Sequence, residues 1–410
     1  MQDKTQVFPL SKVDYVRTRL THSLEASSIG RSIGTLVGER VIERHRLDEF
    51  EAADFGAIVA AACLAHDIGN PPFGHSGEDA IRHWAHTGEY GARRVAMLRG
   101  SEAEDFLSFE GNAQGFRIVT RLQNPDNPGG LQLTCATLAA FTKYPRESCL
   151  AGSRFDGISA KKQGFTADDR PAFEQVAATV GLIPRDTHYA MWCRHPLAFL
   201  VEAADDISYR VIDIEDGYRL GHFSYDEVFD MFWPLITDPA RQRPRLDAIG
   251  DRKNRVEFLR AKVINEAIRE VVECFMAREA DILAGRFDAP LLHEVAVRGA
   301  LDALVDNAAQ RIYCAPEVVS IQAAGFQVVS DLLERFTEVV DDVAERGDRA
   351  SPRSRMLIRL VPEQFIGPGA VPSPEPYQRL LLLTDFVSGM TDSYAVSLYK
   401  KVTGISLPGG

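Results

Sequence analysis

Apolar residues recur at three- and four-residue steps along most of the 410-residue chain, and few stretches alternate apolar and polar positions with period two. The first spacing is typical of helices that bury one face, and the second is typical of strands. The pattern therefore predicts an all-α fold. The segments that predict helices most clearly cover residues 21–37, 55–65, 196–213, 253–278, 291–312, 316–346 and 377–402.

Groups of proline and glycine separate the predicted helices at residues 69–72, 124–130 and 367–376. Both residue types interrupt a helix, so we expect turns at these places. Residues 148–169 are polar and contain glycine, which predicts a loop. The chain has no internal repeat, and no segment has the composition of a flexible linker, which favours one compact helical unit.

Hydrophobic residues make up 45% of the chain and charged residues 25%, as is usual for soluble globular proteins. The longest apolar run, residues 57–65, is far shorter than the roughly 20 residues that a membrane span needs. The N-terminus has no basic segment followed by an apolar run, as a secretory signal would have. We therefore expect a cytoplasmic protein without a membrane partner.

Six cysteines are scattered without a C-x-x-C pair, which indicates reduced thiols rather than a disulfide framework or a thiolate zinc site. The formal net charge is -12. Proteins that bind nucleic acid nonspecifically usually carry a basic surplus instead. Nucleic-acid binding is therefore not indicated, although a local basic patch would still allow it.

The adjacent pair His66 and Asp67 follows the apolar run 57–65 and is followed at once by Gly69 and Pro71. Two good metal-binding side chains thus stand at the end of a predicted helix, where the chain turns. Taken alone, such a pair is more often a helix-terminal histidine beside a solvated aspartate. The rest of the chain must therefore decide between these interpretations.

Two further segments favour a metal site. His22 lies in the first turn of a predicted helix, for which Thr21 is the expected N-cap. Far downstream, Asp205, Tyr209 and Asp213 recur at four-residue spacing and so share one helix face. A different face of that helix is apolar and consists of Leu197, Leu200, Ala204, Ile207 and Val211.

Two histidines and two aspartates form a nitrogen and oxygen ligand set without thiolate. Such a set suits Mn²⁺, Fe²⁺, Zn²⁺, Co²⁺ or Ni²⁺, and Mg²⁺ can join through substrate phosphates. A metal ion bound by these residues would acidify a water molecule and neutralise phosphate charge. The set therefore points to hydrolysis of a phosphate ester.

A second group of chemically active residues follows the His-Asp pair. His75 stands nine residues after His66, across a tight Pro/Gly loop that would bring it back over the metal. Glu78 could orient the His75 imidazole if both lie on the next helix. A histidine and a carboxylate beside a metal form a plausible proton-transfer unit, whereas a surface histidine in a loop is the plainer alternative.

With these motifs in order, the chain resembles the deoxyguanosine triphosphate triphosphohydrolase (dGTPase) family and its dGTPase-like relatives within the HD superfamily. The resemblance covers nearly the whole chain, and the combined motifs are far more specific than the His-Asp pair alone. The matching segments are residues 4–9, 17–25, 65–75, 109–115, 202–209 and 385–392.

The resemblance implies a role for each matching residue. The expected metal ligands are His22, His66, Asp67 and Asp205, and the expected catalytic pair is His75 with Glu78. Four positions are expected to face the sugar and the phosphates, namely Gln6, Arg19, Tyr209 and Asp213. The Tyr209 ring would lie under the deoxyribose, and the Asp213 carboxylate would bind its 3′-hydroxyl. Weaker assignments to the triphosphate are Asn112, Lys143, Tyr144 and Lys162.

The same resemblance implies a dNTP triphosphohydrolase that uses Mn²⁺ or Mg²⁺ and releases a deoxynucleoside and intact triphosphate. Residues 1–220 would form the HD-type catalytic core, and residues 221–410 a helical region packed on it. The expected partners are a dNTP as substrate, a dNTP as effector and further copies of the chain, in a dimer or a hexamer.

Two alternatives stay open at this stage, namely an HD phosphohydrolase of other nucleotide specificity and a regulator that senses nucleotides without turnover. One departure from the family also bears on assembly. Family members usually carry an arginine-containing segment before the Lys-Thr-Gln-Val motif, whereas this chain starts at Met1, only just upstream of it. We expect that the start is misassigned or that an N-terminal piece is missing.

Overall fold

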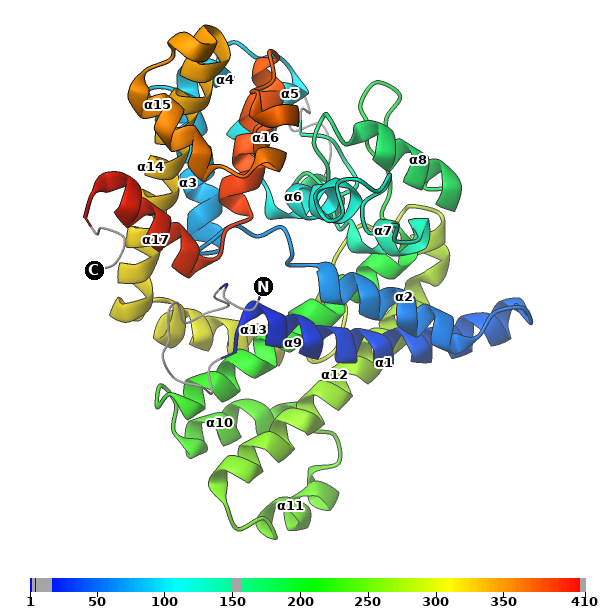
Figure 1. The fold of residues 1–410 in the computed structure, drawn as a ribbon. Coiled ribbons are helices and arrows are strands. Elements are labelled where there is room, and N and C mark those ends of the chain that lie inside the picture. Colours follow the sequence, from blue (N-terminus) through cyan, green and yellow to red (C-terminus); the bar gives the residue numbers. More distant parts are fainter. Residues whose placement is uncertain (2–3, 5–16, 149–155, 406–410) are drawn as a thin grey trace.

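The computed structural model describes residues 1, 4, 17–148 and 156–405, and the regular structure within these residues is helical. Only isolated β-bridges, such as the one between Arg146 and Met191, interrupt that pattern in the described residues. The predicted all-α fold is confirmed (Figure 1).

The α-helices of the described residues follow one another with short connections and with occasional 3-10 and π turns. They are α1 Arg19–His45, α2 Ala52–Ala65, α3 His75–Thr87, α4 Gly91–Val95, α5 Ser101–Leu107, α6 Gly111–Arg117, α7 Cys135–Phe141, α8 Arg170–Val180, α9 Pro196–Arg219, α10 Tyr225–Phe232, α11 Pro239–Asp247, α12 Arg252–Leu283, α13 Arg298–Ala308, α14 Pro316–Arg346, α15 Pro352–Leu357, α16 Pro376–Ser388 and α17 Asp392–Thr403.

Local capping explains two of the differences from the predicted helix bounds. The helix expected over residues 377–402 is in fact two, because Thr391 begins α17 by accepting a hydrogen bond from the Tyr394 amide. The helix expected from residue 291 begins only at Arg298. Thr21 is not the N-cap of α1; Thr18 is, and the two threonines form a reciprocal capping box.

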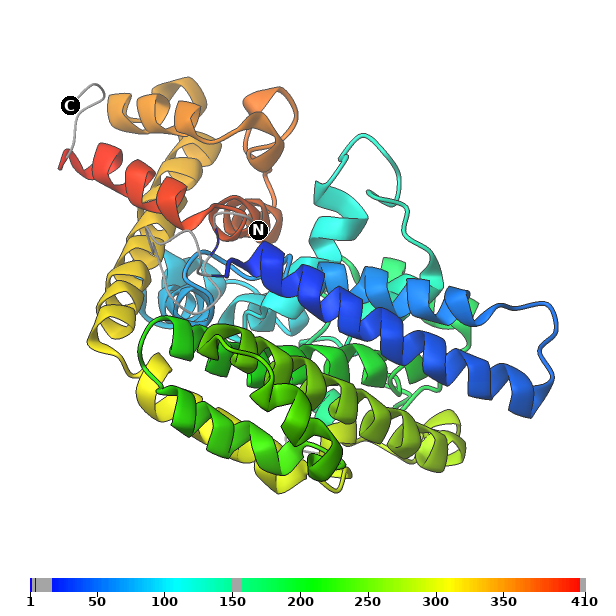
Figure 2. The same ribbon diagram turned by 90° about the horizontal axis from the view of Figure 1, so that it is seen from below.

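One large hydrophobic cluster holds α1, α2, α9 and α12 together. The α1 and α2 helices run side by side, and α9 and α12 lie against them (Figures 1 and 2). The apolar stripe expected on α9 is buried in this cluster. We call this group of helices the first core.

A second hydrophobic cluster joins α3 to the C-terminal helices α14, α16 and α17. The α14 helix packs along α3, and α16 and α17 lie on α14, so residues far apart in sequence meet here (Figure 1). We call this group the second core. Each core contains residues from both sides of position 220.

Among the described residues, no single helix is both long enough and apolar enough to cross a membrane. The segments Arg298–Tyr313 and Pro316–Arg349 reach that length and composition only as a pair, and they meet at an angle of 75°.

Candidate active site

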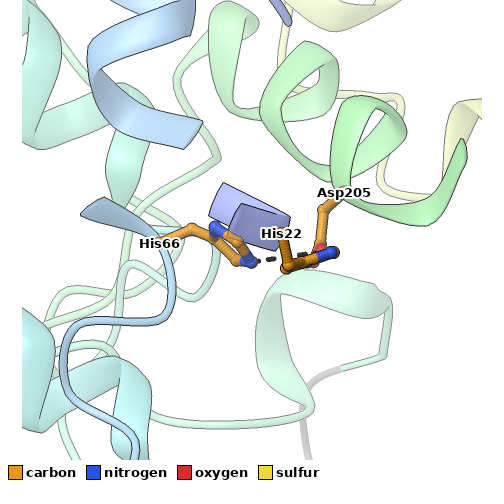
Figure 3. A group of neighbouring side chains, drawn as sticks. All are labelled: His22, His66 and Asp205. Atoms are coloured by element: carbon orange, nitrogen blue, oxygen red, sulfur yellow. Dashed lines mark hydrogen bonds and ion pairs between the residues drawn. The ribbon is translucent and has the colours of Figure 1, made fainter. Parts of the chain in front are cut away.

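Three of the four predicted metal ligands meet in one place. The ligand atoms of His22, His66 and Asp205 all lie within 4.8 Å of one another, although they come from α1, the end of α2 and α9 (Figure 3). Asp205 Oδ1 is 3.1 Å from His22 Nε2 and 3.2 Å from His66 Nε2. Two imidazoles and a carboxylate therefore converge on one point.

The chain around His66 fixes the direction of its ring. His66 is the C-cap of α2, and its Nδ1 lies 2.7 Å from the carbonyl oxygen of Cys63. Because a carbonyl oxygen only accepts, Nδ1 carries the proton and Nε2 is left as the lone-pair donor toward the cluster. A hydrogen bond on the far nitrogen is the usual way in which proteins orient a metal-binding histidine.

Asp67, the fourth predicted ligand, lies beside this cluster. Its Oδ1 is 3.5 Å from His66 Nε2 and accepts a hydrogen bond from Asn70 Nδ2 at 2.6 Å. Its Oδ2 accepts a hydrogen bond from Arg19 Nη1 at 2.6 Å. The role of Asp67 as a ligand stays a prediction, and Arg19 contacts this carboxylate.

Charged neighbours keep these carboxylates anionic. Burial alone would raise the pKa of Asp205, but Lys143, whose Nζ is 2.6 Å from Asp205 Oδ2, and His66 hold that pKa well below its usual value. Burial would likewise lower the pKa of His66, but Asp205 and Asp67 raise it. An anionic carboxylate with two imidazoles is a donor set that fits a divalent transition metal ion.

The cluster opens onto a cavity of about 560 Å³, a size typical of small-ligand sites. His22 is buried and is not one of the lining residues, and Gln6 lies outside the described residues. The other predicted site residues line the cavity, namely Arg19, His66, Asp67, His75, Glu78, Asn112, Lys143, Tyr144, Lys162, Asp205, Tyr209 and Asp213.

The predicted catalytic pair shares the cavity but makes no mutual hydrogen bond among the described residues. His75 is exposed at the first position of α3. Glu78 is buried, and its Oε1 accepts a hydrogen bond from the Gly111 amide at 2.8 Å, whereas its Oε2 has no hydrogen-bond partner in the described part of the chain. The assignment of these two residues as a proton-transfer pair stays a prediction.

Comparison with known proteins matches residues 19–121 to the HD domain family. A protein of Synechocystis named "Deoxyguanosinetriphosphate triphosphohydrolase-like protein" is 46% identical over 413 residues, and a Pseudomonas aeruginosa protein of the same name is 36% identical over 415. Each alignment covers 99% of this chain and 90% of the relative. The chain belongs to the deoxyguanosinetriphosphate triphosphohydrolase-like family. The resemblance inferred from the motifs is confirmed.

A more distant relative in the same family is the "Deoxyguanosinetriphosphate triphosphohydrolase" of Salmonella paratyphi A. It is 31% identical over 472 residues, which again covers 99% of this chain and 90% of the relative. The likeness to dGTPase-like proteins thus extends over nearly the whole chain and beyond the HD domain itself.

The cavity of this family member also contains residues that the sequence did not single out. Tyr313 donates a short hydrogen bond to Asp213 Oδ2, and burial raises the pKa of Asp213 to about 6. Val318 and Gln322 of α14 and Asn70 of the loop after α2 complete the wall. No local motif marks Tyr313, Val318 or Gln322, because Tyr313 lies 100 residues from its partner and α14 reaches the site only through the tertiary fold. Asn70, by contrast, lies within the matching segment 65–75.

Proposed function

We propose that this chain is a metal-dependent dNTP triphosphohydrolase that converts a dNTP, such as dGTP, into a deoxynucleoside and inorganic triphosphate. The observation that carries this proposal is the His22, His66 and Asp205 cluster, which opens onto a cavity lined by cations and by an aromatic ring. The names of the relatives support the same activity.

The metal would be held by His22, His66 and Asp205, with Asp67 as the fourth ligand, and we propose Mn²⁺ or Mg²⁺. When bound, such an ion acidifies a water molecule and offsets phosphate charge. Fe²⁺, Co²⁺, Ni²⁺ and Zn²⁺ fit the same donor types.

The side chains around the cluster would bind the triphosphate and move the proton. Arg19, Lys143 and Lys162 line the cavity and can neutralise phosphate oxygens. Water attacks the α-phosphorus in line, the bond to the nucleoside 5′-oxygen breaks, and that oxygen takes up a proton. His75, exposed at the cavity wall, is the group that we assign to the proton transfer, with Glu78 beside it.

Tyr209 and Asp213 would form the sugar pocket. Both extend along α9 from Asp205 at four-residue steps, so they lie about one and two turns from the metal cluster. A ring packed under the deoxyribose leaves no hydrogen-bond partner for a 2′-hydroxyl, whose desolvation would then oppose ribonucleotide binding.

A product assay tests the proposed function. Each dNTP, each rNTP and (p)ppGpp is incubated with Mn²⁺ or Mg²⁺, and the products are separated by chromatography. We expect a deoxynucleoside and triphosphate from at least one dNTP and far less turnover of the matching rNTP. Cleavage of (p)ppGpp alone would instead indicate another HD phosphohydrolase, and binding without turnover would indicate a nucleotide sensor.

Two variants examine the sugar pocket within the same assay. Tyr209→Ala should reduce the preference for dGTP over GTP by about tenfold, because the ring is lost. Tyr209→Phe keeps the ring and should retain most of that preference. Equal rates on GTP and dGTP in the parent protein would exclude this pocket.

We also propose that the chain forms a homo-oligomer, a dimer or a hexamer, and that a dNTP acts on it as an effector. Closed symmetric assemblies are the usual form of soluble homo-oligomers. Light scattering with and without dNTP tests both points, and a monomeric mass in both conditions would contradict them.

A further inference from the structure

A buried carboxylate behind the phosphate-facing wall of the cavity has no role in the function proposed above. Glu110 immediately precedes α6 and is only 8% exposed. Its Oε1 lies 2.9 Å from Arg82 Nη2, and its Oε2 lies 2.8 Å from Lys162 Nζ. It therefore sits between a cation of α3 and a cation of the cavity wall.

Arg82 connects Glu110 to Glu78, the carboxylate of the proposed catalytic pair. It stands one helical turn after Glu78 on α3, and its Nη2 is 3.7 Å from Glu78 Oε2. Its Nε donates a hydrogen bond at 2.9 Å to the carbonyl oxygen of Phe109, the residue before Glu110. The guanidinium thus holds both the side chain of Glu110 and the backbone that leads into it.

The backbone after Glu110 contacts the same catalytic carboxylate. The Gly111 amide donates to Glu78 Oε1 at 2.8 Å. A Cβ at Gly111 would stand 2.8 Å from Glu78 Oε1 and 2.4 Å from Asn70 Oδ1, so any larger residue there would have to displace these two side chains. The position of Glu110 is therefore fixed relative to Glu78 from two directions.

Lys162, by contrast, has little local structure to fix its side chain. It follows the 3-10 turn Ile158–Ala160 and lies outside any α-helix, and within the described residues its ammonium forms an ion pair only with Glu110. A lysine side chain loses about 1.5–2 kcal/mol of rotamer entropy when it is ordered. An anchor that orders it beforehand removes that cost from ligand binding.

We propose that Glu110 is a positioning residue for the triphosphate: it holds the Lys162 ammonium at the cavity wall and, through Arg82, in a fixed place relative to Glu78. This inference rests on the proposed function, because it takes the ligand of Lys162 to be a polyphosphate. Glu110 and Glu78 carry two negative charges, and Arg82 and Lys162 carry two positive ones, so the group is balanced before the ligand arrives.

Two physical effects of Glu110 oppose each other, and their balance makes the proposal testable. Its negative charge lowers the attraction of the wall for phosphate, so removing it would strengthen binding if charge alone mattered. Its ion pair orders Lys162, so removing it would weaken binding if positioning dominates. The proposal requires the second result.

The experiment measures binding of inorganic triphosphate to the full chain by calorimetry, in the presence of Mn²⁺, which needs no turnover. Glu110→Gln keeps the side-chain shape without the charge and should weaken binding about tenfold, the effect typical of losing one charge-assisted contact. Lys162→Met should weaken it at least as much. The double variant should bind as the Lys162→Met variant does, because the two residues act as one unit.

Two further variants keep the result interpretable. Glu110→Asp retains the charge but shortens the side chain by one methylene group. Its affinity for triphosphate should lie between those of the parent and the Glu110→Gln variant. Glu174→Gln removes an exposed carboxylate of α8 that pairs with Arg170, and should leave triphosphate binding unchanged. Circular dichroism checks that each variant is folded.

Steady-state kinetics provide a second readout. The Glu110→Gln variant should show a raised KM for the dNTP with kcat changed by less than about threefold, since binding rather than chemistry is altered. Unchanged or tighter triphosphate binding, or additive losses in the double variant, would overturn the role of Glu110. Absence of dNTP hydrolysis by the parent protein would instead contradict the proposed function, and the two failures are thus distinct.

Discussion

The two hydrophobic cores contribute different parts of the candidate active site. His22, His66 and Asp205 belong to helices of the first core, or to their ends, whereas His75 and Glu78 stand on α3, which packs with the C-terminal helices of the second. The metal ligands and the proposed proton-transfer groups are therefore positioned by separate packing. Activity should depend on how the two cores are held together.

The buried carboxylates of the metal site and of α5 also differ in charge. Cations beside Asp205 and Asp67 hold the pKa of each below its usual value in spite of burial. Asp105, on α5 at the edge of the second core, lies beside Tyr377 and the Ala167 amide, and burial raises its pKa to about 7. Burial alone favours the neutral acid, and a cation beside the carboxylate opposes that effect.

Buried polar contacts cross the boundary between the cores. Arg117 Nε, at the end of α6, donates to Asp385 Oδ2 of α16 at 2.8 Å, and its Nη1 lies 2.9 Å from Asp168 Oδ2. Lys4 Nζ donates to the carbonyl oxygens of Asn70 at 2.6 Å and of Ser388 at 2.8 Å, and burial lowers the pKa of Lys4 to about 7. These contacts tie the metal-site loop to the C-terminal helices.

The largest expected effect on activity comes from removing a metal ligand that the first core positions. His66→Ala or Asp205→Ala should abolish dNTP hydrolysis and strip the bound metal, because even losing a group that orients a ligand costs about 10- to 100-fold. Metal content is measured by elemental analysis and hydrolysis by product chromatography. The exposed His188→Ala is the matched control. Full metal occupancy in either ligand variant would contradict the assignment.

Replacing His75, which stands on a helix of the second core, should separate proton transfer from metal binding. His75→Gln should lower kcat by about 100- to 10,000-fold, the range of general acid–base catalysis, while the metal stays bound. Stopped-time product assays and elemental analysis on the same sample test this. Loss of metal from the His75→Gln variant would mean that the two cores do not divide the chemistry in this way.

Sequence periodicity predicted long helices of both cores well because these helices pack along their own apolar stripes. The α14 bounds and the burial of the α9 stripe agree with the prediction. Helix ends that depend on a single side chain were harder to predict. Thr391 caps a new helix within one expected helix, and Thr18 replaces Thr21 as a cap. A cap depends on one hydrogen bond that hydrophobic spacing does not reveal.

The residues of the candidate site likewise fall into those that the sequence could predict and those that it could not. His66 and Asp205 carry chemistry that a motif can reveal, and the fold brings them together with His22. Tyr313 and Glu110 act through partners that are distant in sequence or lie on another segment. Such contacts arise only from the tertiary packing of both cores, so one sequence read along its length could not predict them.

Removing Arg117, which connects the two cores, should have the next largest effect, in this case on stability. Arg117→Met leaves Asp385 buried without its cation, which should lower the free energy of unfolding by about 3 kcal/mol or more. Asp169 would keep its second partner, Arg121, whose Nε is 2.8 Å from Asp169 Oδ1. Urea unfolding measured by circular dichroism gives this value. The exposed pair of Arg243 and Asp247 offers the control Arg243→Met, which should cost less than about 1 kcal/mol. A stability equal to that of the parent would show that the cores do not need this network.

The smallest expected effect is the pH dependence of stability that arises from Asp105 of the second core. The pKa of Asp105 is raised from 3.8 to about 7, so the folded chain binds the proton more tightly than the unfolded chain does. The associated stability is fully present below about pH 4 and is lost as the pH rises through 7.

Asp105→Asn removes this titration, so the parent should lose stability relative to the variant by about 2 kcal/mol between pH 5 and pH 7, given at most about 1.4 kcal/mol per pH unit. Urea unfolding of both proteins across this range measures the difference, and Asp230→Asn, on the exposed face of α10, should show none. A difference that stays constant with pH would mean that Asp105 is ionised when buried, and its contrast with the metal-site carboxylates Asp205 and Asp67 would then be lost.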